Sequence, residues 1–347
     1  MRRSAGAFAL LLLAAGCSFR SPILAPEPRA VLDTLVPELR ALAFSPDGLL
    51  LASAGGDDSG GDEITLWTVA TGARKSTFTS LPGTISALAF SPDSQSIAVG
   101  EAEGRIRILD AQTGVERVSF AGRLGRVTCL AYTFDGKALI TMVEGDPEAE
   151  FRRWDVKTGE SRDLFTPPAA PPVALASDGS QLALPSPGDP AGIRIVDLET
   201  RKERLLSRIG LLQGDTLIFT PDSKGVAAVH VEDWSPLPNH VPYLYVISGK
   251  GKTLLRSPRP FGSRRALAVS HDAKLLAHAV GLGLQLWELD RKEVRTTLDE
   301  TPSGEAIELL VFSPDDKTLV SADTGGRILL WDVPRLLEIR REPSGVQ

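Results

Sequence analysis

Short apolar segments separated by polar turns recur along the chain from about residue 30. Ile85, Ala87 and Ala89 fall on alternate positions, a period typical of a β-strand. This strand runs into Ser91-Pro92-Asp93-Ser94, where proline presets φ and the polar residues favour a chain reversal. A second apolar strand, a loop and a third strand follow, and then a turn into a more polar fourth strand. The pattern predicts antiparallel units of four strands, called a to d in chain order.

The a–b turn recurs seven times at a nearly constant distance. Its aspartates are separated by 46, 42, 43, 44, 50 and 43 residues, at Asp47, Asp93, Asp135, Asp178, Asp222, Asp272 and Asp315. A period of ~40–45 residues is typical of a propeller blade. One four-stranded sheet leaves both faces unburied, whereas sheets stacked around an axis cover one another. The sequence therefore predicts an all-β fold, a seven-bladed β-propeller of four-stranded antiparallel blades, over residues 30–347.

Strand c ends in an aromatic or apolar residue that is often followed by an acid, as at Trp154-Asp155 and Trp331-Asp332. Together with the Ser-Pro-Asp turns, this resembles the WD40-repeat β-propeller family over residues 30 to about 335. The resemblance implies a propeller that serves as a protein-binding platform. The family's Gly-His before strand a is absent, and none of the four histidines stands there. We therefore expect the family's His-Ser-Asp-Trp hydrogen-bond network to be largely missing.

Both ends of the repeat region bear on how the ring closes. Residues 30–35 alternate like a strand and precede the first strand a, whereas the tail after Asp332 has no Thr-Gly turn into a fourth strand. We predict that the N-terminal strand supplies the outer strand of the last blade.

The N-terminus has the pattern of a bacterial lipoprotein signal. Arg2 and Arg3 precede an apolar stretch of eleven residues, Ala5 to Ala15, which is shorter than the ~20 residues of a membrane span. Small residues then precede Cys17, which resembles a lipobox, so residues 1–16 are interpreted as the signal peptide and Cys17 as the lipidated residue. Residues 17–29, with three prolines, are predicted to be a tether. Ser18 resembles the outer-membrane sorting signal of enterobacterial lipoproteins, so we expect an extracytoplasmic protein that is lipid-anchored to a bacterial membrane, the outer in preference to the inner.

Charge narrows the class of partner. The chain has 38 basic and 44 acidic residues, and removal of Arg2 and Arg3 would change the net charge from −6 to −8. This balance argues against nucleic acid, which requires a basic stripe. Among the first five repeats, the b–c loops hold acids but no lysine or arginine. These acids are Asp57, Asp58, Asp62, Glu63, Glu101, Glu103, Glu144, Asp146, Glu148, Glu150, Asp189, Glu232 and Asp233. We take Glu144, Glu148 and Glu150 as candidate contacts for a partner with a basic surface; the alternative is that acids simply favour tight turns.

Two b–c loops contain residues that are candidates for binding. The first holds Asp57, Asp58 and Asp62, whose oxygens are weak candidates for a cation, although the spacing of a known calcium loop is missing and a solvated loop is the alternative. The second makes the fifth repeat longer than the others. Its Trp234, Leu237 and Tyr243 are candidate partner contacts, and the alternative is that Trp234 packs on its own blade.

No catalytic motif stands out in the sequence. Cys129 lies on an apolar strand without a nearby histidine and is interpreted as a structural thiol. The sequence therefore favours a non-catalytic protein-binding scaffold of the cell envelope, a monomeric propeller without a cofactor that binds another envelope protein. The alternative is a propeller enzyme, or a small-ligand or cation binder, that uses the central channel.

Overall fold

The structure, a computed structural model, describes residues 26–34, 36–57, 61–81, 83–144, 149–165, 173–186, 192–209, 216–231, 242–258 and 266–339. Residues 1–25, which contain the expected signal peptide and Cys17, lie outside these ranges. Among the described residues, no helix has the length and apolarity needed to cross a membrane.

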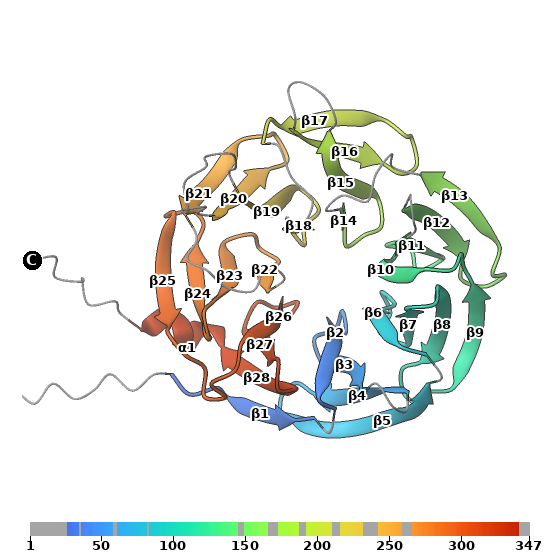
Figure 1. Cartoon of the computed structure of the whole chain (residues 1–347), viewed down its shortest axis with the longest axis horizontal. Coiled ribbons are helices and arrows are strands. Elements are labelled where there is room, and N and C mark those ends of the chain that lie inside the picture. The colour runs from blue at the N-terminus through green and yellow to red at the C-terminus, as the bar shows by residue number, and fades with distance from the viewer. Residues whose placement is uncertain are drawn as a thin grey trace, which may run out of the picture.

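Seven four-stranded antiparallel sheets form the blades, which are arranged radially around a central axis (Figure 1). Blades 1 to 3 consist of β2 (Glu38–Phe44), β3 (Leu50–Gly56), β4 (Asp62–Thr68), β5 (Ala73–Leu81), β6 (Ile85–Phe90), β7 (Ser96–Glu101), β8 (Arg105–Asp110), β9 (Glu116–Ala121), β10 (Arg126–Tyr132), β11 (Ala138–Glu144), β12 (Glu150–Asp155) and β13 (Ser161–Phe165). Blades 4 to 6 consist of β14 (Ala174–Leu175), β15 (Gln181–Ser186), β16 (Gly192–Asp197), β17 (Glu203–Ser207), β18 (Thr216–Phe219), β19 (Gly225–Val231), β20 (Pro242–Ser248), β21 (Thr253–Pro258), β22 (Leu267–Val269), β23 (Leu275–Val280), β24 (Gly283–Glu288) and β25 (Glu293–Leu298). Blade 7 consists of β26 (Ile307–Phe312), β27 (Thr318–Asp323), β28 (Arg327–Asp332) and β1 (Ala30–Asp33). The predicted fold class is confirmed.

The ring closes through its N-terminal strand, as the sequence predicts. Strand β1 pairs antiparallel with β28, in the register Ala30↔Leu330 to Asp33↔Arg327. Leu32 is 1% exposed and packs with residues of blades 7 and 1, including Trp67 and Val320. The outer strand of the last blade is therefore contributed by the opposite end of the repeat region.

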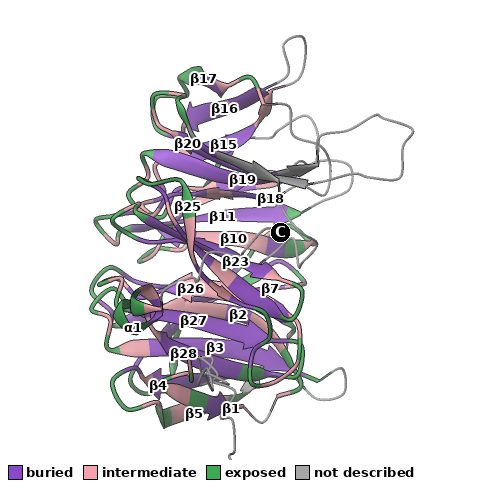
Figure 2. Ribbon diagram, turned by 90° about the vertical axis from the view of Figure 1, so that its left-hand side faces the viewer, coloured by how far each residue is buried: buried purple, intermediate pink, exposed green. Residues whose placement is uncertain are grey.

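The hydrophobic core is divided among the seven blade interfaces. Each of seven buried clusters combines side chains from two neighbouring blades, so every sheet is covered on both faces by its neighbours. Figure 2 shows this edge-on, with the buried strands stacked between two exposed faces. Stability consequently depends on every blade being in place.

Hydrogen bonds explain why the Ser-Pro-Asp turn recurs. In blade 2 the Ser91 hydroxyl donates to Asp93 and accepts from the Ser96 amide at 2.9 Å, while the Asp93 carboxylate accepts from the Gln95 amide at 3.0 Å. Ser94 has a φ of +60°, and glycine occupies the same place at Gly48 and Gly136. The Ser91 hydroxyl and the Gln95 amide lower the pKa of Asp93, so this carboxylate stays ionised in the folded turn. The same residue types therefore form the same turn geometry in successive blades.

The tryptophans that end strand c retain part of the network that the sequence predicts to be largely missing. Their indole N–H groups donate to strand b: Trp67 to Ser53, Trp154 to Thr141 and Trp331 to Ser321, at 2.8, 2.9 and 2.9 Å. In blade 6 a buried His278 replaces the hydroxyl, and its Nε2 accepts from Trp287 at 3.0 Å. The link from the indole to strand b is therefore retained although the family's Gly-His is absent.

The tail after β28 forms a short helix, α1 (Val333–Glu338). Its N-cap Asp332 accepts from the Arg335 amide at 2.9 Å, and the buried Val333 and Leu336 pack on blades 6 and 7. The absence of a Thr-Gly turn was noted in the sequence, but the helix was not predicted.

Candidate interaction faces

The two ends of the blades define two faces. The loop face carries the b–c and d–a connections, and the turn face carries the a–b and c–d turns. All internal residues that lie outside the described ranges belong to b–c or d–a connections, including residue 35 between β1 and β2. The turn face is therefore described in every blade.

The Asp62 side chain points into the interior of the protein. This side chain is 2% exposed; one carboxylate oxygen accepts from Arg40 at 2.6 Å, and the other accepts from the Ile85 amide of blade 2 at 2.6 Å. Burial opposes the charge on Arg40, but hydrogen bonds to Asp62 and Glu38 raise the pKa of this guanidinium above its ordinary value. Asp62 thus joins blades 1 and 2, and its two oxygens already have donors.

Two further acids near this face are also paired. Glu101, 3% exposed, accepts from Arg107, which also donates to Glu116 at 2.7 Å. Glu150 is half-buried and lies 2.6 Å from Arg152. Three of the thirteen acids that the sequence assigns to the loop face, Asp62, Glu101 and Glu150, are therefore neutralised by neighbouring arginines.

The exposed acids form a smaller set than the sequence suggests. Asp57, Glu103 and Glu144 are exposed, and Asp299, Glu300 and Glu305 of later d–a connections, which we did not predict, extend this set. Asp58, Glu148, Trp234 and Leu237 lie outside the described residues, and Tyr243 is described only as a backbone position in β20, paired with His230. Within the described ranges no group of three or more histidine, cysteine or acidic side chains could hold a metal ion.

An exposed leucine marks one described patch on the loop face. Leu124 is 83% exposed in the d–a connection between blades 2 and 3. The surrounding backbone is tightly packed: a Cβ added at Gly104 would overlap the Arg123 carbonyl, and one added at Gly125 would overlap the Glu144 carbonyl. Leu124 was missed, although an apolar residue between Arg123 and Gly125 in a polar connection was visible in the sequence.

The inner strands around the axis are predominantly apolar. Leu42, Leu88, Leu130 and Leu310 are half-buried on β2, β6, β10 and β26. Cys129 is half-buried on β10, and burial raises the pKa of its thiol to about 11. A thiol that stays protonated at neutral pH is a poor nucleophile, which agrees with its interpretation as structural.

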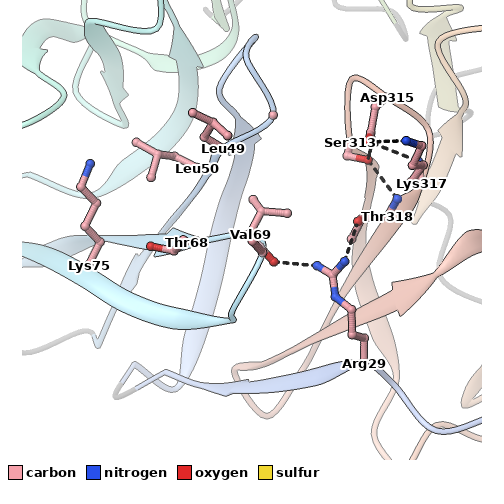
Figure 3. Close-up of a pocket in the computed structure, with 12 residues that line it drawn as sticks. Arg29, Leu49, Leu50, Thr68, Val69, Lys75, Ser313, Asp315, Lys317 and Thr318 are labelled. Atoms are coloured by element: carbon pink, nitrogen blue, oxygen red, sulfur yellow. Dashed lines mark hydrogen bonds and ion pairs between the residues drawn. The ribbon is translucent and has the colours of Figure 1, made fainter.

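A cavity of about 490 Å³ lies on the turn face where blades 7 and 1 meet (Figure 3). Arg29 spans this seam: its guanidinium donates to the Val69 carbonyl at 2.6 Å and to the Thr318 hydroxyl at 3.4 Å. Leu49, Lys75 and Lys317 also line the cavity. The seam is thus fastened by a residue that directly precedes β1.

Family models identify WD40 repeats in three stretches. A model described as WD domain, G-beta repeat matches residues 33–59 and 295–332, and one described as Anaphase-promoting complex subunit 4 WD40 domain matches residues 65–135. The WD40 part of the resemblance is therefore supported.

Similar curated proteins are WD-repeat proteins of eukaryotes. The chain is 27% identical to WD repeat-containing protein 90 of Homo sapiens over 287 residues, which cover 78% of this chain and 16% of that protein. It is 21% identical to Periodic tryptophan protein 2 of Arabidopsis thaliana over 304 residues, 88% of this chain and 30% of that protein. The chain thus spans under a third of the length of these relatives.

Among solved structures, Kuenenia stuttgartiensis Hydrazine Synthase superposes with a TM-score of 0.68 at 17% identity, covering 86% of this chain and 97% of that chain. At this identity the likeness shows a shared fold only.

Proposed function

We propose that this protein is a non-catalytic protein-binding scaffold, a WD40-like propeller lipoprotein that lipid on Cys17 holds to a bacterial membrane. It binds another envelope protein, one with a basic surface, through the loop face. The observation that carries this proposal is the Leu124 patch, a large apolar side chain, 83% exposed, on a tightly packed stretch of backbone.

The surroundings of Leu124 suit a protein contact. An apolar anchor ringed by polar groups is the usual anatomy of a hot spot. Glu103 and Glu144 are exposed beside the Leu124 connection, which contributes Arg123 and Arg126 to the same rim. The rim therefore offers charges of both signs around one apolar side chain, and the other exposed acids of the face favour a basic partner.

The polar groups of the described loop face favour binding over catalysis. Asp62 and Glu101 are held by arginines, and Glu150 lies against Arg152. These groups stabilise the blades and leave the surface, rather than a cleft, as the part that meets other molecules.

Replacement of Leu124 by glutamate should remove the partner without unfolding the propeller. We expect about thirtyfold weaker binding, equivalent to ~2 kcal/mol for a hot-spot residue. The measurement is co-purification of tagged protein from detergent-solubilised membranes of the native host, with the partner quantified by mass spectrometry. Leu205→Glu is the matched control, because Leu205 is 50% exposed but lies on the outer strand β17.

The proposal requires one envelope protein to be recovered with wild type and Leu205→Glu but lost with Leu124→Glu. Equal recovery with both variants would remove the Leu124 patch as the binding site. If wild type retains no protein, the scaffold proposal itself fails.

A further inference from the structure

All ten lysines of the chain lie on the turn face. Each stands in an a–b or c–d turn or within three residues of one, and each is exposed: Lys75, Lys137, Lys157, Lys202, Lys224, Lys250, Lys252, Lys274, Lys292 and Lys317. No lysine occurs in a loop-face connection. The turn face therefore carries the lysines of the chain, whereas exposed positive charge on the loop face comes from arginines such as Arg123 and Arg126.

Most of these ammonium groups are not paired. Lys224, Lys274 and Lys317 lie 3.8, 3.0 and 4.0 Å from the aspartates of their own turns. The other seven form no ion pair with a described residue. The ammonium groups can therefore reach outward on their four-carbon stems.

The aspartates of the a–b turns on the same face are held close to the backbone. In blade 3 the Asp135 carboxylate accepts from the Thr133 hydroxyl at 2.7 Å and from the Lys137 amide at 3.1 Å. The same arrangement recurs in the other Ser/Thr-x-Asp turns, for example at Asp222 and Asp315. Their negative charge offsets part of the lysine charge from short side chains fixed within the turns, and exposed glutamates at the c–d turns, Glu160, Glu199 and Glu293, offset a further part.

Three large apolar side chains are exposed among the lysines. Leu49, Val115 and Phe134 are 64%, 63% and 86% exposed in turns of blades 1, 2 and 3. Phe134 stands where four other a–b turns have proline. Its turn is closed by a 2.8 Å bond from the Gly136 amide to the Thr133 carbonyl, and the ring, which is 86% exposed, lies outside the core. Nothing in blade architecture requires these exposed side chains.

The chain enters the propeller from the same face. Strand β1 takes the position of strand d in blade 7, and strand d begins at the turn face. Arg29, immediately before it, contacts the c–d turn of blade 1 through the Val69 carbonyl (Figure 3). A tether that ends at Arg29 is therefore attached to the lysine-bearing face.

We propose that the turn face lies on the headgroups of an anionic bilayer. The lysines bind lipid phosphates, and Leu49, Val115 and Phe134 reach between the headgroups. Basic residues near an anionic surface and partly inserted apolar residues reinforce a lipid anchor, which alone leaves orientation undetermined. This inference builds on the proposed attachment through Cys17, and it directs the loop face away from the membrane, toward its partner.

A fluorescent amino acid at position 134 tests the orientation, with position 124 of the loop face as the control. The full-length protein, purified from membranes, is reconstituted into vesicles of phosphatidylglycerol and phosphatidylcholine that carry a headgroup-linked nitroxide quencher. We expect strong quenching at 134 and none at 124. The quenching at 134 should be lost in high salt, in pure phosphatidylcholine and in a Lys75→Glu/Lys137→Glu/Lys157→Glu variant.

Equal quenching at 134 and 124, or quenching at 134 that does not depend on anionic lipid, would overturn the inference. The inference would also fail if position 134 were buried in native membranes but remained unquenched on anionic vesicles. That result would mean that a membrane protein, not lipid, covers the turn face. Retention of wild type on phosphatidylcholine vesicles reports the Cys17 anchor separately. If wild type were not retained on phosphatidylcholine vesicles but position 134 were still quenched on anionic vesicles, the Cys17 anchor would be rejected. The orientation of the turn face toward lipid would still stand.

Discussion

Replacing Leu32 by alanine is expected to lower the free energy of unfolding by about 2–5 kcal/mol, the usual cost of truncating a buried leucine. Leu32 is 1% exposed and is the buried side chain of β1, the strand that closes the ring. Its loss leaves a cavity between blades 7 and 1, beside Trp67 and Val320. Because every blade is covered by two neighbours, weakening this seam should lower the stability of the whole propeller. Chemical denaturation measures the change, and hydrogen exchange at 30–33 reports whether the strand opens first.

The neighbouring residue provides the control for this experiment. Val31 lies on the same strand but is 49% exposed, so Val31→Ala should change stability by no more than about 0.5 kcal/mol. Similar effects of the two substitutions would mean that β1 does not contribute the buried closing contact described here.

Replacing Arg40 by methionine is expected to destabilise the protein by about 3–5 kcal/mol, because it leaves a buried charge without its partner. Asp62 is 2% exposed and would keep only the Ile85 amide as a donor. Adding Asp62→Asn should restore part of the loss, since asparagine retains an acceptor for this amide without a charge. Thermal or chemical unfolding of the single and double variants gives the coupling between the two residues.

Glu38→Gln is the matched control, because Glu38 pairs with the same Arg40 at 2.9 Å but is 60% exposed. An exposed ion pair contributes about 0–1 kcal/mol. If Arg40→Met were as mild as Glu38→Gln, the bond between Arg40 and Asp62 would not be the link between blades 1 and 2 that its burial indicates.

The sequence was sufficient for the parts of the fold that repeat. The Ser-Pro-Asp turn is a local structure, in which Ser91 and Asp93 satisfy amides a few residues away, so its composition carries its geometry. Closure by β1 was predictable because residues 30–35 alternate and the tail after Asp332 lacks a turn. Helix α1 was not predicted, because six residues are too few for a helical period and its Val333 and Leu336 depend on packing against other blades.

The candidate site was less accessible to sequence reasoning, because exposure depends on partners far along the chain. Asp62 belongs to an acidic loop in the sequence, but Arg40 and the Ile85 amide turn it inward. Leu124 is an ordinary residue of the sequence until tight packing at Gly104 and Gly125 fixes the backbone that exposes it. The separation of lysines from loop-face acids could have been found in the sequence, by sorting charges according to the turn or loop that holds them.

Membrane attachment of a folded propeller through Cys17 is tested most directly by fractionating cells that produce wild type or Cys17→Ser. A high-salt wash removes electrostatic contacts of the turn face and leaves lipid as the remaining attachment. We predict that wild type and a Cys129→Ala control stay with the membranes, whereas Cys17→Ser is recovered in the soluble envelope fraction with an unchanged unfolding midpoint. Cys17→Ser that remained membrane-bound after this wash would contradict the lipid anchor.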